Sequence, residues 1–302
     1  MFDILRYPFM QNALLAGGFV ALIAPLIGYF LIIRGLTFAG HALPNIGFAG
    51  AAGAVLLQVD PVFGLFAFTI SAGVGIALLG KQVRERDISI GILMTFALGL
   101  GLMFLSLYSG YAQRVYSILF GTILGISYAD VLITALVSIL ILLLMLILFR
   151  PLLFSSLDPA LALARGVPVQ FLSVIFLTLV AITISVAIQV IGALLVFVLL
   201  IGPAATAIRL AHRPLWTILI ATALSISYTV LGIVLAGLNG FWPVSFYIAT
   251  ISFCVYLPVR LLTGWRSKNY RRGPSSLQPD QAESSLDQAA VQTASHIHGT
   301  TH

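Results

Sequence analysis

Runs of about 20 consecutive apolar residues recur along this sequence, and they constrain its fold more than any other feature. The 302 residues are 60% hydrophobic and only 8% charged, and the mean hydropathy is +1.11. A soluble core of this size does not need so much apolar surface, and the sequence lacks the short alternating segments of a transmembrane barrel. The sequence therefore predicts an all-α fold, a polytopic transmembrane helical bundle.

About nine segments have the length that a helix needs to cross roughly 30 Å of hydrocarbon. These predicted spans lie at 12–33, 40–58, 62–80, 88–108, 129–149, 169–190, 192–210, 214–236 and 243–263. The stretch 110–127 is interrupted by Gly, Ser and Arg114, so we expect a short external helix or a re-entrant segment there. Asp60 and Asp130 stand where spans begin, and we interpret them as caps.

Basic residues orient these spans. If the N-terminus is outside, only Arg6 and Arg114 of the 15 Lys and Arg residues fall outside, and the rest fall in inner loops and the tail. We therefore expect a multi-pass protein of the cell (inner) membrane with a cytoplasmic tail. The first residues lack the basic start, apolar core and cleavage site of a signal peptide, so we expect none to be removed.

The composition changes abruptly after Trp265, where Ser, Gln and Pro replace the large apolar residues. We expect a transmembrane domain at 1–265 and a disordered cytoplasmic tail at 266–302, because such a composition cannot bury a core. Alternating histidines in a tail of this kind can bind zinc or nickel; here they are His296, His298 and His302. We attribute the net charge of +6 to the loops and not to nucleic-acid binding.

The segment RGLTFAGHALPNIGFAGAAG (34–53) carries His41 and Asn45 among small and apolar residues. Residues four apart share one face of a helix, so both side chains can face the same cavity. Asn45 lies about 16 Å from the inner face at 1.5 Å per residue, near the midplane. Polar groups at that depth indicate a functional site, and the alternative is a seam of small residues between two helices.

The inner loop SSLDPALALARGVP (155–168) contains the signals of a short helix capped at both ends. Asp158 suits the N-cap, Pro159 the first helical position, and Gly166 a left-handed turn at the end. A helix of about two turns is not stable alone and should dock on something. It is either a connector on the bilayer surface or a coupling helix that seats in a groove of a partner ATPase.

Two further motifs bear on mechanism. Pro203, in GALLVFVLLIGPAATA (192–207), cannot donate a hydrogen bond and crowds the carbonyl of Leu199, which predicts a kink or break in that span. GIALLGK (75–81) nearly matches a nucleotide-binding P-loop, but Gln82 follows where Ser or Thr is required. We therefore expect no ATPase site, and thus no enzyme activity, in this chain.

Five segments in order resemble the membrane permeases of ATP-driven importers for zinc, manganese or iron. The first, 34–50, is similar to the family's RRMAFFGDALSHAVLPG. The others are 90–99, SILFGTILGIS (117–127), the inner loop with Asp158, Pro159, Ala162, Gly166 and Pro168, and 192–207 with Pro203.

The resemblance implies a membrane-spanning subunit that forms the translocation path as a dimer. It implies a divalent metal as the transported substrate and no cofactor bound by the chain. A cytoplasmic ATP-binding subunit would dock at 155–168, an extracytoplasmic protein would deliver the metal, and nucleic acid would have no part.

The sequence departs from the family where the metal is thought to be held. The family's Asp and His are replaced by His41 and Asn45, and its Ser by Pro44. The metal-contacting role therefore falls on His41 and Asn45. Imidazole is a good ligand for zinc, iron or nickel, whereas the Asn carbonyl is weak and uncharged. A chelated metal, of siderophore or cobalamin type, is the first alternative cargo. A secondary transporter that needs no ATPase is the second alternative.

Overall fold

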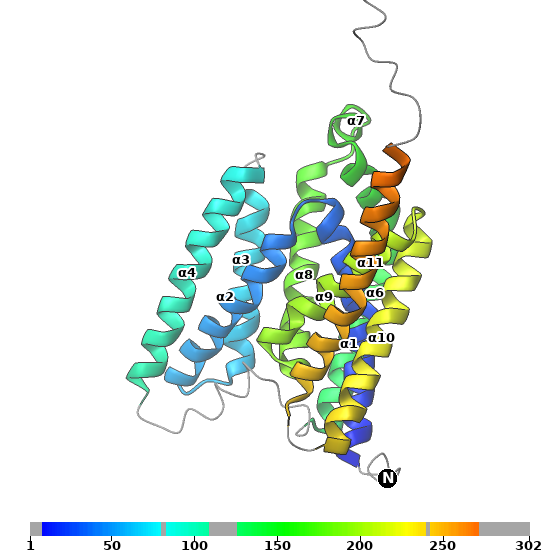
Figure 1. The fold of residues 1–302 in the computed structure, drawn as a ribbon. Coiled ribbons are helices and arrows are strands. Elements are labelled where there is room, and N and C mark those ends of the chain that lie inside the picture. The colour runs from blue at the N-terminus through cyan, green and yellow to red at the C-terminus, as the bar shows by residue number, and fades with distance from the viewer. Residues whose placement is uncertain (1–7, 80–82, 109–125, 240–241, 272–302) are drawn as a thin grey trace, which may run out of the picture. The chain divides into compact units, whose positions relative to one another are not determined.

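The protein is described here by a computed structural model, which covers residues 8–79, 83–108, 126–239 and 242–271. These ranges contain helices and no strand, which confirms the all-α prediction (Figure 1). The helices are α1 (Pro8–Ile33), α2 (Thr37–Leu56), α3 (Pro61–Leu78), α4 (Val83–Leu107), α6 (Tyr128–Leu157), α7 (Pro159–Ala164), α8 (Val169–Ile191), α9 (Ala193–Leu210), α10 (Pro214–Asn239) and α11 (Val244–Arg271). Contacts divide the chain into Met1–Arg260 and Leu261–His302. Of the second unit only the end of α11 is described, and the fold below is that of the first.

Each predicted span coincides with a helix. Seven helices in the described residues are long and apolar enough to cross a membrane, namely α1, α3, α4, α6, α8, α10 and α11. The remaining two predicted spans correspond to α2 and to α9, whose apolar part is shorter. The chain is therefore a multi-pass membrane protein. The segment predicted at 110–127 falls almost wholly outside the described residues. Of the tail predicted at 266–302, only the first six residues are described, and they continue α11 to Arg271.

Helix α1 lies at the centre of the main core and packs against α6, α8, α9 and α10. Its Phe30 is fully buried and meets Phe149 of α6 and Phe176 of α8 edge-on, at ring-centroid distances of 5.7 and 6.2 Å. Helix α2 packs mainly against α3 and α4. A Cβ atom added to Gly64 of α3 would lie 2.1 Å from the carbonyl oxygen of Gly50, so α2 and α3 approach each other backbone to backbone.

The helix starts show which cap predictions hold. Asp60 is the N-cap of α3, since its Oδ1 accepts a 2.9 Å hydrogen bond from the Val62 amide. The cap predicted at Asp130 is wrong, because Ser127 is the N-cap of α6. Asp130 is the third helical residue and reaches back to the Ser127 amide at 3.0 Å, which completes a capping box.

Of the kink or break predicted at Pro203, the break is not present. Helix α9 continues through Pro203 to Leu210, and the chain bends at Gly192, whose φ of +85° separates α8 from α9. Gly192 can adopt this left-handed conformation because it has no Cβ. Proline removes only one hydrogen bond from α9, and close packing can hold the helix there. Gly202 supplies that packing, because a Cβ on it would lie 2.3 Å from the hydroxyl of Ser252.

Candidate functional site

The short helix α7 lies between the end of α6 and the start of α8, and both of its predicted caps are present. Oδ1 of Asp158 accepts a 2.9 Å hydrogen bond from the Leu161 amide, and Pro159 occupies the first turn. At the other end Gly166 has a φ of +77°. The Gly166 amide donates to Leu163 and the Val167 amide to Ala162, both at 3.0 Å, as in a Schellman motif. Local sequence therefore fixes the whole of α7.

One face of α7 packs on the bundle and the other faces outward. Ala162 is fully buried, and the helix contacts both α6 and α8. Leu161 and Leu163 are 43% and 56% exposed, and Leu157 at the end of α6 is 72% exposed. Exposed leucines on a capped helix at the end of a membrane bundle form an apolar surface of the kind that a protein partner covers.

Arg34, in the turn between α1 and α2, forms hydrogen bonds with the helices that precede and follow α7, which are α6 and α8. Its Nη2 donates a 2.6 Å hydrogen bond to Oγ of Ser173 in α8, and its Nη1 a 3.4 Å bond to Oγ of Ser155 in α6. Its guanidinium also lies 5.5 Å from the ring centroid of Phe176. Burial, and then the charge of Arg86, lower the pKa of Arg34 to about 10, so it remains charged at neutral pH. Its charge is held in place by neutral partners.

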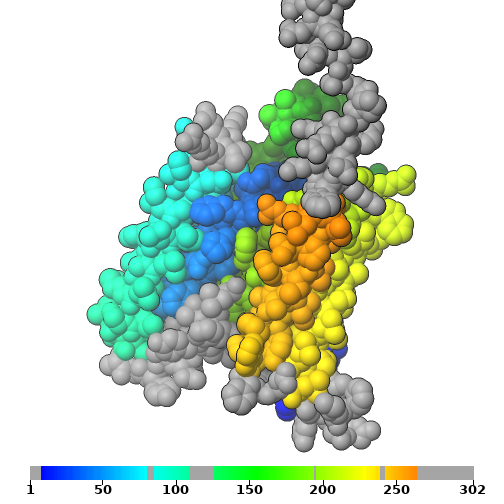
Figure 2. All heavy atoms as spheres, viewed as in Figure 1, coloured from blue at the N-terminus to red at the C-terminus, as the bar shows by residue number. Residues whose placement is uncertain are grey.

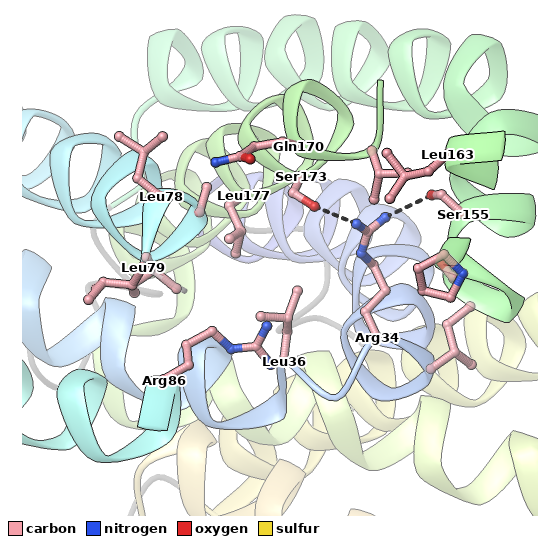
Figure 3. A pocket seen from close by; sticks show the side chains of 16 residues that line it. Arg34, Leu36, Leu78, Leu79, Arg86, Ser155, Leu163, Gln170, Ser173 and Leu177 are labelled. Carbon is pink, nitrogen blue, oxygen red and sulfur yellow. Dashed lines mark hydrogen bonds between the residues drawn. The ribbon is translucent and has the colours of Figure 1, made fainter. Parts of the chain in front are cut away.

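A cavity of about 520 Å³ opens beside Arg34 (Figure 3). Its walls come from the ends of α1, α3 and α6, the starts of α2, α4 and α8, and α7. Arg86 of α4 reaches into this region, and its Nη2 donates a 2.9 Å hydrogen bond to the carbonyl of Gly35. The ends that meet here are the ones that the charge pattern predicts for the inner face.

His41 and Asn45 lie one turn apart on α2, as the sequence predicts, but they are not enclosed within the single chain. His41 is exposed, and its ring meets Phe197 of α9 edge-on at 5.0 Å between centroids. Phe38 lies 6.5 Å from the same imidazole. Atoms of α2 contribute to the surface beside α4 in Figure 2. The imidazole is thus positioned by aromatic rings and stays accessible from outside the chain.

Asn45 is half-buried, and its amide nitrogen is already in use. Nδ2 donates a 2.9 Å hydrogen bond to the backbone carbonyl of His41 and approaches Sδ of Met94 in α4 at 3.7 Å. This leaves the amide oxygen as the group that Asn45 can offer to a cation. Met94 adds a thioether, which is a soft, neutral ligand.

One chain does not complete a metal site in the part that the structure describes. No group of three or more His, Cys, Asp or Glu comes together among those residues. The acidic residues there stand at helix ends, as Asp60, Glu85, Asp87, Asp130 and Asp158. The donors near His41 are therefore all neutral, and one chain supplies fewer of them than the four to six ligands that divalent metals take.

Sequence patterns did not indicate three parts of this arrangement: the tie from Arg34 to Ser155 and Ser173, the contact of Met94, and the ring of Phe197. Each of these contacts joins two residues that lie between 49 and 156 positions apart in the sequence. The sequence indicated only that Arg34 is a basic residue at the inner end of a span, and not which residues it contacts.

Comparisons with known proteins agree with this architecture. Residues 6–262 match the ABC 3 transport family. The manganese import system permease protein ScaB of Streptococcus gordonii is 35% identical over 231 residues, which cover 75% of this chain and 82% of that protein. The manganese transport system membrane protein MntC of Halalkalibacterium halodurans is 32% identical over 212 residues, covering 70% and 73%. The solved structure of PsaBC from Streptococcus pneumoniae in complex with Fab superposes with a TM-score of 0.73 at 32% identity, covering 85% of this chain and 93% of that one.

Proposed function

We propose that this chain, which belongs to the ABC 3 transport family, is the membrane-spanning subunit of an ATP-driven importer for divalent transition metal ions, with manganese as the first candidate cargo. The observation that carries this proposal is the family match over residues 6–262, together with the manganese permeases among the relatives. The resemblance predicted from five short motifs is thus confirmed at the level of the family.

Hydrolysis of ATP would come from a separate cytoplasmic subunit that docks on α7. The caps of α7 and the exposed Leu161 and Leu163 support this role for the loop 155–168. Arg34 would transmit the movement, because it joins both flanks of α7 to the turn that starts α2. The coupling role would then be to form and seat the docked helix, through the caps Asp158, Pro159 and Gly166 and the buried Ala162.

The translocation path would form between two copies of the chain in the cell (inner) membrane. His41 faces outward from a single chain, and two copies would bring two sets of His41 and Asn45 together. A second copy also supplies ligands that one chain lacks in its described part. An extracytoplasmic metal-binding protein would deliver the ion to the outer end of this path.

A second candidate cargo follows from the donors themselves. Manganese prefers carboxylate and carbonyl oxygens, whereas imidazole and thioether suit zinc, iron and softer ions. His41, Asn45 and Met94 are neutral donors on neighbouring helices. This set favours a softer divalent ion, or a metal that arrives already neutralised by a chelator of the siderophore or cobalamin type.

Reconstitution tests the proposal directly. The chain would be purified with its ATP-binding subunit, placed in vesicles, and supplied with the metal-binding protein, ATP and equal amounts of manganese, zinc and iron salts. We expect ATP-dependent accumulation of one or more of these ions, measured by elemental analysis. Equal accumulation by vesicles that lack the ATP-binding subunit would instead indicate a secondary transporter.

A further inference from the structure

We propose that the cavity beside Arg34 and Arg86 binds the phosphate group of an anionic phospholipid from the cytoplasmic leaflet. This site is separate from the metal path and goes beyond the proposed transport function. It holds whichever ion the protein carries. The argument rests on charge, on cavity size and lining, and on position in the membrane.

Two positive charges meet at this cavity, and no negative partner lies beside them among the described residues. Arg34 and Arg86 both line it, and their side chains donate hydrogen bonds to neutral acceptors, the hydroxyls of Ser155 and Ser173 and the carbonyl of Gly35. In the described ranges neither guanidinium forms an ion pair, and Nε of Arg86 is buried without a hydrogen-bond partner. An oxyanion in the cavity would supply the negative charge that is lacking.

The neighbouring carboxylate does not fill this role. Asp87 follows Arg86 in α4, and its Oδ1 is itself buried without a hydrogen-bond partner among the described residues. Adjacent helix positions point in different directions, and Asp87 is not among the residues that line the cavity. The anion must therefore come from outside this part of the chain.

The size and lining of the cavity favour a lipid over a free ion. About 520 Å³ lies within the range of roughly 300–1,000 Å³ that is typical of small-molecule sites and far exceeds one phosphate. Much of the wall is apolar, and Figure 3 shows Leu78, Leu79 and Leu177 across the cavity from Arg34. The guanidinium groups would hold the phosphate, and these leucines would contact the glycerol and the first acyl carbons.

The position of the cavity fits the same ligand. It lies among the helix ends around α7, at the level where headgroups of the cytoplasmic leaflet are expected. Basic pockets between membrane helices on that side bind anionic headgroups. A carboxylate from a soluble partner would not use the apolar wall that α3 and α8 provide.

Competitive lipid retention tests this proposal. The full-length chain, purified with its ATP-binding subunit, would be mixed with equal amounts of phosphatidylglycerol and phosphatidylcholine of the same chain length. Retained lipids would be counted by native mass spectrometry. We expect wild type to prefer phosphatidylglycerol by about tenfold, and Arg86→Gln to lower that ratio by about fivefold, the effect of one arginine near an anionic headgroup. Arg86→Lys should keep more of the preference than Arg86→Gln.

Arg213→Gln is the matched control, because Arg213 is an exposed arginine in the turn between α9 and α10. Its ratio should equal that of wild type, and an equal loss in both glutamine variants would mean that only overall surface charge matters. No preference in wild type would overturn the proposal. So would displacement of phosphatidylglycerol by excess inorganic phosphate, which would indicate a free-anion site. If only the chain without its ATP-binding subunit retains the lipid, an acidic group of that subunit is the occupant and the proposal fails.

Discussion

Arg34 and Ser173 are joined by a 2.6 Å hydrogen bond, which connects the turn before α2 to the second turn of α8. His41 lies about one turn into α2, and α8 begins shortly after α7. A hydrogen bond from a charged donor contributes about 1.5–3 kcal/mol. The contact therefore links the start of α2 to α8, the helix that follows the proposed docking helix α7.

Ser173→Ala should uncouple ATP hydrolysis from transport. The substitution removes the acceptor and leaves Arg34 with the longer bond to Ser155 and the contact with the Phe176 ring. We expect the reconstituted complex to keep hydrolysing ATP but to transport about tenfold less metal per ATP, corresponding to the loss of ~1.4 kcal/mol. Ser156→Ala is the control, because that hydroxyl donates only to Leu152 within its own helix. The same loss in both variants would contradict a specific role for the tie.

Asp158→Ala should weaken binding of the ATP-binding subunit. The side chain caps α7, and loss of an N-cap costs about 1 kcal/mol of helix stability. A six-residue helix has few other hydrogen bonds to stabilise it. We therefore expect about fivefold weaker association in a pull-down or calorimetric titration. Asp60→Ala removes an equivalent cap from α3 at the other end of the bundle and should leave association unchanged. If both variants bind like wild type, α7 is not the docking element.

The features that the sequence predicted well depend on local residues. A span needs only a long apolar run, and the caps of α7 need only Asp158, Pro159 and Gly166 in their own turns. The prediction of α7 was therefore correct because the hydrogen bonds that cap it join residues only a few positions apart.

Most of the features that it missed depend on packing between distant residues, and the exception is the cap of α6, which is local. Ser127 and Asp130 could each cap α6, and only the reciprocal bonds of the capping box distinguish them. The helix persists through Pro203 while Gly202 packs on Ser252 of another helix. Met94 reaches Asn45 from 49 residues away, and no periodicity in the sequence indicates that contact.

Gly64→Ala should destabilise the protein by separating α3 from α2. The new Cβ would lie 2.1 Å from the carbonyl of Gly50 and 2.7 Å from Cβ of Ala54, so the backbones must move apart. Overpacking of this kind costs about 1–3 kcal/mol, and we expect a lower midpoint of thermal unfolding in detergent. Gly75→Ala is the control on the same helix, since nothing lies within 4 Å of its added Cβ. Alanine is the better helix former by about 1 kcal/mol, so the control should unfold at an equal or higher temperature.

His41→Asp should change which metal the importer prefers. A carboxylate at this position supplies the hard, charged oxygen that manganese favours and removes the imidazole that suits zinc. It also offsets the charge of a divalent ion near the middle of the membrane. With equal manganese and zinc outside reconstituted vesicles, we expect the ratio of manganese to zinc taken up to rise by about tenfold, or ~1.4 kcal/mol. His41→Ala should lower the uptake of both ions. His212→Asp, at an exposed histidine in the turn between α9 and α10, adds the same charge away from the path and should leave the ratio unchanged. Unaltered uptake and selectivity in both His41 variants would show that the ion passes without contacting this residue, and the path would then have to be sought on another face of the bundle.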